Sequence, residues 1–350
     1  LKREFIGGEL ADIRNTILPI GAAIGGMIVP ALIFLSLNLG TPQTMGWGIP
    51  MATDIAFALG VVYLLGDKVP ASAKLFLTTL AIVDDLGAVL VIAFFYTSEL
   101  SIASLLFGLC FLAVMFIGNR LGIKSLFFYA ALGIGGVWVT FLLSGIHATI
   151  AAVLAAFMIP ADAKINESVY LKRMKKLTRR FEKEEPNEVR TLEEGQVDVL
   201  THIQHDTEIA IPLLQQLEHK MSPIVTFLIM PIFAIANAGI SFTDLSLSDI
   251  FSTHVALGVT LGLLLGKPIG IIGATFLMVK MRWATLPSAI TRRTLLGLGM
   301  LASIGFTMSM FISTLAFTDE LLMTQAKLGI FLASILGGIG GYVLLNKKSK

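Results

Sequence analysis

The stretch AKLFLTTLAIVDDLGAVLVIAFFYT, residues 73–97, is apolar over most of its length and carries two adjacent aspartates near its middle. A helix rises about 1.5 Å per residue, so one helix of this length can cross the roughly 30 Å hydrocarbon core of a bilayer. A charge at the bilayer centre costs about 2.5–3.5 kcal/mol on insertion scales. Carboxylates at that depth therefore indicate an ion or proton path rather than packing alone.

The rest of the chain has the same apolar character. It contains 350 residues, of which 55% are hydrophobic and 14% charged, and its mean hydropathy is +0.83. Soluble domains carry about 25% charged residues. The net charge of +2 is too small to indicate nucleic-acid binding, and the single cysteine, Cys110, excludes an internal disulfide framework. We interpret the chain as an all-α polytopic membrane protein with one transmembrane domain over residues 1–350.

Ten apolar segments are long enough, or nearly so, to be membrane helices. The block from 125 to 160 is longer than one span needs, and we divide it at Ser144-Gly145. The predicted spans have approximate cores at residues 17–38, 43–66, 73–97, 101–118, 125–143, 146–160, 213–240, 254–278, 293–316 and 323–346.

Basic residues sort onto one face of the predicted bundle. With ten alternating spans, every Lys and Arg except Lys267 and Lys327 falls on the same side. The positive-inside rule makes that side cytoplasmic and places both ends of the chain there. Residues 161–212 form a charged, partly helical connector on this side. A lipid-binding or regulatory role is the alternative to a solvated linker.

Two of the predicted spans carry residues that interrupt a helix. In GWGIPMATDIAFALG, residues 46–60, Pro50 lacks an amide proton, and Thr53-Asp54 follow at mid-depth. In LLGLGMLASIGFTMSMFIS, residues 295–313, glycines weaken the helix, and the hydroxyls of Thr307 and Ser309 can satisfy freed backbone groups. Asp54 can compensate the positive ends of broken helices. Such breaks are tolerated where they face protein or a wet cavity.

The two breaks lie in corresponding parts of the chain. Residues 17–97 and 254–346 each hold three predicted spans, of which the middle one is broken. The first trio begins inside and the second outside, so we expect inverted repeats. Paired interrupted segments of this kind are the best sequence-level indication of a transporter site.

The charged residues of the predicted spans favour ion exchange. Adjacent helical residues point about 100° apart, so one of Asp84 and Asp85 can line an ion site while the other faces its entrance or a partner helix. The pair should exchange protons as a coupled unit: protonated at low pH, and open to a hard cation at higher pH. Lys267, beside Pro268, can exchange protons, neutralise helix C-termini or pair with either aspartate; the sequence leaves these roles open.

Six motifs occur in an order that resembles the NhaA-type sodium/proton antiporters of bacterial inner membranes. They are PMATDIAFALG, LAIVDDLGA, SGIHATIAA, PIFAIANAG, LLLGKPIGI and, less fully, the IGFTMS stretch. The resemblance implies that Asp84 and Asp85 bind Na⁺ or Li⁺ and exchange protons. It implies that Thr53 and Asp54 belong to the interrupted segment beside the site, and that Lys267 balances helix dipoles. Residues 46–66 and 293–316 correspond to the family's crossed, unwound helices, and no cofactor is implied.

The chain also departs from the family pattern. KREF, residues 2–5, matches the cytoplasmic end of the family's second helix, so we expect the first two of twelve helices to be missing. The extracellular hairpin through which family members form homodimers would be missing with them. Parts of the family's pH-response cluster are matched by Arg3, Glu4, Glu218 and His219, whereas Gln215 and Gln216 stand where basic residues are expected. We therefore expect the pH response to differ.

These observations predict an electrogenic Na⁺/H⁺ antiporter that works by alternating access for Na⁺ and pH homeostasis. Its partners would be Na⁺, Li⁺, H⁺ and the lipid bilayer. The chain would not be an enzyme: an intramembrane aspartyl protease needs its two carboxylates on different helices. A passive cation channel is the other alternative, and it would need a continuous lining of weak sites.

Overall fold

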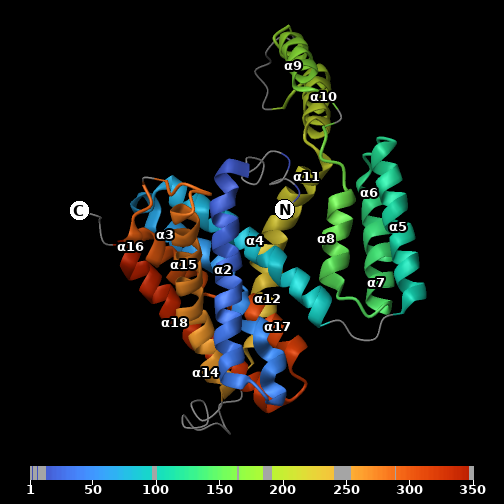
Figure 1. The fold of residues 1–350 in the computed structure, drawn as a ribbon. Coiled ribbons are helices and arrows are strands. Elements are labelled where there is room, and N and C mark those ends of the chain that lie inside the picture. Colours follow the sequence, from blue (N-terminus) through green and yellow to red (C-terminus); the bar gives the residue numbers. More distant parts are fainter. Residues whose placement is uncertain are drawn as a thin grey trace. The chain divides into compact units, whose positions relative to one another are not determined.

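The computed structural model describes residues 2, 6, 13–96, 101–163, 165–183, 191–239, 254–287 and 289–346. In these ranges the regular structure is helical, as the sequence predicts. The chain divides into two compact units, whose helices are drawn in Figure 1. The first comprises Leu1–Ser98 with Ile229–Lys350, and the second comprises Glu99–Leu228.

Eight stretches in the described residues are long and apolar enough to cross a membrane, and one bent pair of helices makes a ninth. Each coincides with a predicted span. The tenth predicted span, residues 146–160, contains only α8 (Ala148–Met158), an apolar helix of 11 residues. At about 1.5 Å per residue, α8 is roughly 16 Å long, well short of a bilayer core.

The first unit opens with three of these spans. The long helix α2 (Ile13–Asn38) is followed by η1 (Pro42–Met51), a ten-residue 3₁₀ helix, and then by α3 (Ile55–Leu65). Residues 52–54 between η1 and α3 are not helical, so the predicted interruption is confirmed. The short η2 (Gly66–Lys68) leads into α4 (Ala71–Phe95), the helix that carries both aspartates.

The first unit closes with a second set of three spans. In the first of them, α14 (His254–Leu261), the π-helical turn η5 (Gly262–Gly266) and α15 (Lys267–Lys280) are continuous. Helices α16 (Arg292–Ala302) and α17 (Phe306–Ala316) bend by 45° at the intervening residues, which confirms the second predicted interruption. The last helix is α18 (Glu320–Asn346), and α12 (Met230–Ala238) also belongs to this unit.

Glycines allow the helices of the first unit to approach closely. A Cβ built on Gly270 of α15 would lie 2.1 Å from the carbonyl oxygen of Gly25 on α2. A Cβ on Gly337 of α18 would lie 2.8 Å from the carbonyl oxygen of Met300 on α16. Small residues that let backbones touch are the usual way in which membrane helices associate.

The second unit holds three shorter apolar segments and a polar helical hairpin. It contains α5 (Ile102–Arg120), then α6 (Leu126–Ala130), η3 (Ala131–Trp138) and α7 (Val139–Leu143) as one continuous span, and then α8. Helix α11 (Leu213–Ile224) continues into η4 (Val225–Ile229), where the division between the two units falls.

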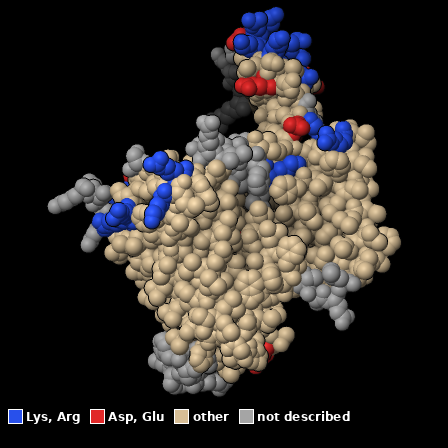
Figure 2. Space-filling model, viewed as in Figure 1, with Lys and Arg blue, Asp and Glu red and all other residues tan. Residues whose placement is uncertain are grey.

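The predicted connector, residues 161–212, contains the hairpin of α9 (Glu167–Phe181) and α10 (Glu194–Ala210). Arg173 pairs with Asp206 at 2.9 Å, and Arg180 pairs with Asp198 at 3.0 Å, so these ion pairs join the two helices. Other basic side chains of α9 are exposed. Figure 2 shows Lys and Arg gathered at the top of the hairpin.

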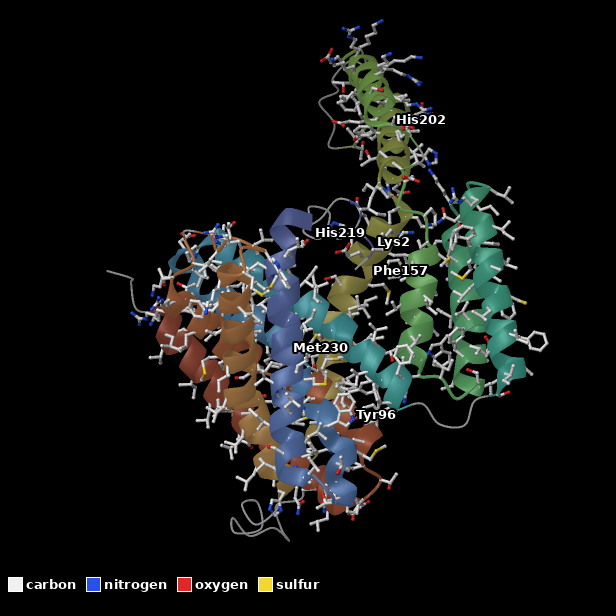
Figure 3. The ribbon with its side chains drawn as sticks, viewed as in Figure 1. Lys2, Tyr96, Phe157, His202, His219 and Met230 are labelled. Carbon is white, nitrogen blue, oxygen red and sulfur yellow. The ribbon has the colours of Figure 1, made fainter. Side chains whose placement is uncertain are left out.

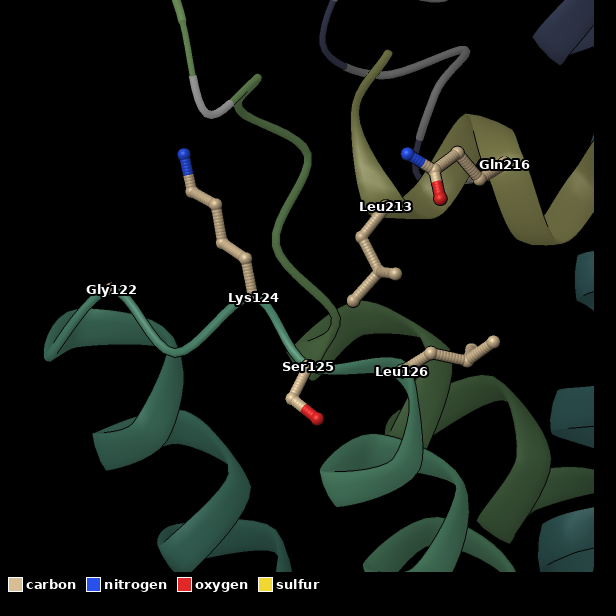
Figure 4. A pocket seen from close by; sticks show the side chains of 6 residues that line it. All are labelled: Gly122, Lys124, Ser125, Leu126, Leu213 and Gln216. Carbon is tan, nitrogen blue, oxygen red and sulfur yellow. The ribbon is translucent and has the colours of Figure 1, made fainter. Parts of the chain in front are cut away.

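A cleft of about 620 Å³ lies at the base of this hairpin within the second unit (Figure 4). Lys124 and Gln216 are among its polar lining residues. The Gln216 side chain donates to the carbonyl oxygen of Ile211 at 2.9 Å and so fixes the turn from α10 into α11. This structural role is consistent with an uncharged residue at position 216.

Candidate ion-exchange site

The two helix interruptions of the first unit meet each other. The backbone N–H of Asp54 donates to the carbonyl oxygen of Ile304 at 2.6 Å. The hydroxyl of Ser309, on α17, donates to the carbonyl oxygen of Ile49, on η1, at 2.8 Å. Broken helices leave unpaired backbone groups that are costly to bury. Here each interrupted segment supplies a hydrogen-bond partner to a backbone group of the other.

Asp54 joins the N-terminal ends of the two half-helices that follow the breaks. It is the N-cap of α3, and its Oδ1 accepts from the N–H of Phe57 at 3.3 Å. Its Oδ2 accepts from the N–H of Thr307 at 3.0 Å and from the Thr307 hydroxyl at 2.5 Å, at the start of α17. Helix N-termini carry partial positive charge, so one carboxylate stabilises both ends.

Asp84, Thr53 and Lys267 come together beside this crossing, and all three are fully buried. Oδ2 of Asp84 accepts a hydrogen bond from the Thr53 hydroxyl at 2.6 Å and forms an ion pair with the Lys267 ammonium. The ammonium also donates to the Thr53 hydroxyl at 2.9 Å. Removing one partner from such a buried pair would leave an uncompensated charge, so the three side chains depend on one another.

The local helix geometry at Lys267 is irregular. The residue directly follows the π-helical turn η5, and the next residue, Pro268, has no N–H to donate. π-helical turns inside α-helices frequently occur at functional sites. The close approach of α15 to α2 at Gly270 and Gly25 lies less than one turn further along the helix.

Two carboxylate oxygens at the site have no hydrogen-bond donor among the described residues. They are Oδ1 of Asp84 and Oδ1 of Asp85, and both atoms are buried. Buried polar atoms are nearly always hydrogen-bonded, so these two acceptors require a physical explanation. Carboxylate oxygens are ligands that suit hard cations. Asp85 is only partly buried, in keeping with the 100° turn between adjacent helical residues.

An apolar cluster lies on each side of the charged layer along every helix that enters it. On α4, Leu80 belongs to one cluster and Ala88 to the other, with the aspartates between them. Lys267 likewise lies between Leu263 and Ile271, which belong to different clusters. The site is therefore a polar layer between two apolar ones.

The pH-response cluster of Arg3, Glu4, Glu218 and His219 stays a prediction. Glu218 and His219 lie on α11 in the second unit, and Figure 3 labels His219. Arg3 and Glu4 lie outside the described residues. No group of three or more His, Cys, Asp or Glu side chains that could hold a metal ion occurs in the described part of the chain.

Sequence reasoning missed two side-chain contacts of the interrupted segments. It expected Thr307 to satisfy freed backbone groups, whereas the Thr307 hydroxyl donates to the Asp54 carboxylate. The position of Thr307 two residues after Gly305 was the available signal. It also passed over Tyr96, whose hydroxyl donates to the carbonyl oxygen of Met45 at 2.6 Å. The only signal was a phenol at the end of an apolar run.

Comparison with known proteins gives a consistent result. The family model described as Na⁺/H⁺ antiporter 1 matches residues 1–345. The chain is 48% identical to Na(+)/H(+) antiporter NhaA 2 of Syntrophotalea carbinolica, over 100% of this chain and 80% of that protein. It is 47% identical to Na(+)/H(+) antiporter NhaA of Oleidesulfovibrio alaskensis (99% and 76%) and 46% identical to that of Wolinella succinogenes (99% and 76%). With its apolar helices and crossed interruptions, the chain is a multi-pass membrane protein that belongs to the NhaA family of Na⁺/H⁺ antiporters.

Proposed function

We propose that this chain is a secondary active transporter, not an enzyme, that exchanges Na⁺ for H⁺ across the bacterial inner membrane by electrogenic alternating access. Asp84 and Asp85 bind the cation and exchange the protons. The observation that carries this proposal is the pair of buried carboxylate oxygens that have no donor among the described residues. They lie beside a buried ammonium where two membrane helices are broken.

Protons and Na⁺ compete for the same oxygens. In the structure, the Lys267 ammonium and the Thr53 hydroxyl compensate the charge of Asp84. A cation that binds Oδ1 of Asp84 and Oδ1 of Asp85 brings a second positive charge close to Lys267. Like charges repel strongly in a low-dielectric interior, so cation entry favours release of protons from the site. Proton return weakens the carboxylates as ligands and releases the cation.

Alternating access follows from the cost of an uncompensated site. Two uncompensated carboxylates within an apolar bundle cost free energy. The protein therefore switches between its inward-open and outward-open conformations when it carries either Na⁺ or protons. The repeated arrangement of the first unit supports this step. Residues 17–97 and 254–346 each contain a broken middle segment, and we assign them as inverted repeats whose relative motion exposes the site to one face at a time.

The basic residues support an orientation for this transporter. The exposed Lys and Arg side chains of α9 lie in the segment between α8 and α10, and the positive-inside rule assigns that segment to the cytoplasm. With the ten alternating spans that the sequence predicts, of which α8 is one, both chain ends are cytoplasmic as well. Homodimer formation stays a prediction. Li⁺ should replace Na⁺ as cargo, whereas K⁺ needs a larger cage.

Transport in everted membrane vesicles with a pH-sensitive dye tests the proposal. Adding Na⁺ or Li⁺ to vesicles with the wild-type chain should release protons, and Asp84→Asn or Asp85→Asn should abolish this release. Asp67→Asn is the control, because Asp67 is exposed on η2 outside the site. If either site variant still exchanges Na⁺ for protons at the wild-type rate, the assigned site is wrong. Na⁺ flux without any proton exchange would instead indicate a channel.

A further inference from the structure

Tyr96 connects α4 to the first half of the broken segment. It follows the last residue of α4, and Figure 3 labels it there. Its hydroxyl donates to the carbonyl oxygen of Met45 at 2.6 Å and accepts from the N–H of Gly48 at 3.2 Å. Both partners belong to η1, so one side chain holds two backbone groups of this 3₁₀ helix.

The contact is close and specific. A Cβ built on Gly48 would lie 2.8 Å from the Tyr96 hydroxyl oxygen, so the phenol occupies the space that a side chain would need. The neighbouring residues also pack together: the rings of Trp47 and Phe95 meet edge to face, with 5.0 Å between their centroids. 3₁₀ helices have poor internal hydrogen-bond geometry and are rarely longer than 3–4 residues. The ten residues of η1 therefore need this external support.

Helix α4 consequently contacts the segment formed by η1 and the non-helical residues 52–54 at two points. One is the hydrogen bond between Thr53 and Asp84, at the candidate site. The other is Tyr96, twelve residues further on and about 18 Å away along the helix axis. The two points differ in one respect. Asp84 must exchange partners whenever a cation binds or leaves, whereas the Tyr96 hydroxyl bonds to two uncharged backbone groups of η1.

We propose that Tyr96 is a positioning residue for cation binding. It holds η1 against α4 while the contact between Thr53 and Asp84 opens and closes, and this keeps the oxygen atoms of the break in place for the cation. The inference rests on the proposed function, because it assigns Tyr96 a role in setting the affinity of that site.

Tyr96→Phe in the full chain tests this inference, because it removes the hydroxyl and keeps the ring. In everted vesicles, the Na⁺ concentration for half-maximal proton release should rise about three- to tenfold, as expected for the loss of two partly exposed hydrogen bonds. The maximal rate per molecule should stay within about twofold, since the residue touches no cargo. Tyr63→Phe is the control, because Tyr63 is an exposed tyrosine of α3.

Gly48→Ala provides an independent route to the same result. The added methyl should displace the phenol and raise the half-maximal Na⁺ concentration as Tyr96→Phe does. In a Tyr96→Ala background the obstructing ring is gone, so Gly48→Ala should then add little. A merely structural role for Tyr96 would lower the amount of folded protein and the maximal rate without this shift in Na⁺ dependence.

The outcomes separate the two proposals. If the wild-type chain exchanges Na⁺ and Tyr96→Phe matches Tyr63→Phe in its Na⁺ dependence, the role of Tyr96 is refuted and the proposed function stands. An equal effect of Gly48→Ala with and without the Tyr96 ring would also refute it. A wild-type chain that releases no protons on Na⁺ addition would overturn both.

Discussion

The contact between α2 and α15 gives a sharp test of how the site is held. Gly270 lies three residues after Lys267 on α15, and its Cα faces the backbone of Gly25 on α2. A Cβ at Gly270 would lie 2.1 Å from the Gly25 carbonyl oxygen and 2.7 Å from its carbonyl carbon. Both obstructing atoms are backbone, so no side chain can rotate away.

Gly270→Ala must therefore separate the two helices. Ordinary contact requires more than 3 Å, so α2 and α15 have to move apart by about 1 Å at this point. Overpacking of this kind costs about 1–3 kcal/mol. Because Lys267 is less than one turn away, its ammonium must shift relative to Asp84, and we expect weaker Na⁺ binding as well as lower stability.

The assay combines thermal unfolding of the purified protein in detergent with the vesicle measurement. Gly270→Ala should lower the unfolding midpoint by about 2–10 °C and raise the half-maximal Na⁺ concentration. The control is Gly273→Ala, on the same helix, where a Cβ would meet no atom within 4 Å. Alanine has the higher helix propensity, so the control should be neutral or slightly more stable. Equal midpoints for the two variants would refute the proposed contact.

Two further variants test the Asp84 ion pair. Thr53→Val keeps the shape of the side chain and removes the hydroxyl that joins Lys267 to Asp84. The half-maximal Na⁺ concentration should therefore rise roughly tenfold. An unchanged half-maximal concentration would exclude the hydroxyl from the site. Lys267→Met should lower the free energy of unfolding by about 3–5 kcal/mol, because Asp84 is left buried and unpaired. Adding Asp84→Asn should restore most of this stability, and a strictly additive double variant would contradict the pairing.

Local sequence patterns predicted the spans and both interruptions because those features depend on nearby residues. Apolar length defines a membrane helix, and Pro50 and Gly305 disturb a helix at their own positions. Within the predicted span 146–160 the helix α8 is shorter than expected, because apolar composition does not fix where a helix begins and ends.

Contacts at the site depend on tertiary packing, which local patterns do not contain. Thr53 and Asp84 are 31 residues apart, and Lys267 and Asp84 are 183 residues apart. The sequence left open whether Lys267 would compensate helix ends or pair with an aspartate. The π-helical turn before Lys267 decides its direction, and no residue type in GLLLG specifies such a turn.

The position of the charged layer explains why the least favourable features of the fold occur together. Interrupted helices, a buried ion pair and carboxylate oxygens with no donor in the described part of the chain each reduce stability, yet all lie between two apolar clusters. The helices that enter the layer pass through one cluster before it and the other after it. In the proposed transporter, a cation reaches Asp84 from one face only if the contacts of one cluster separate while those of the other stay closed. The same packing that offsets the cost of the site can thus form the barrier that alternating access requires.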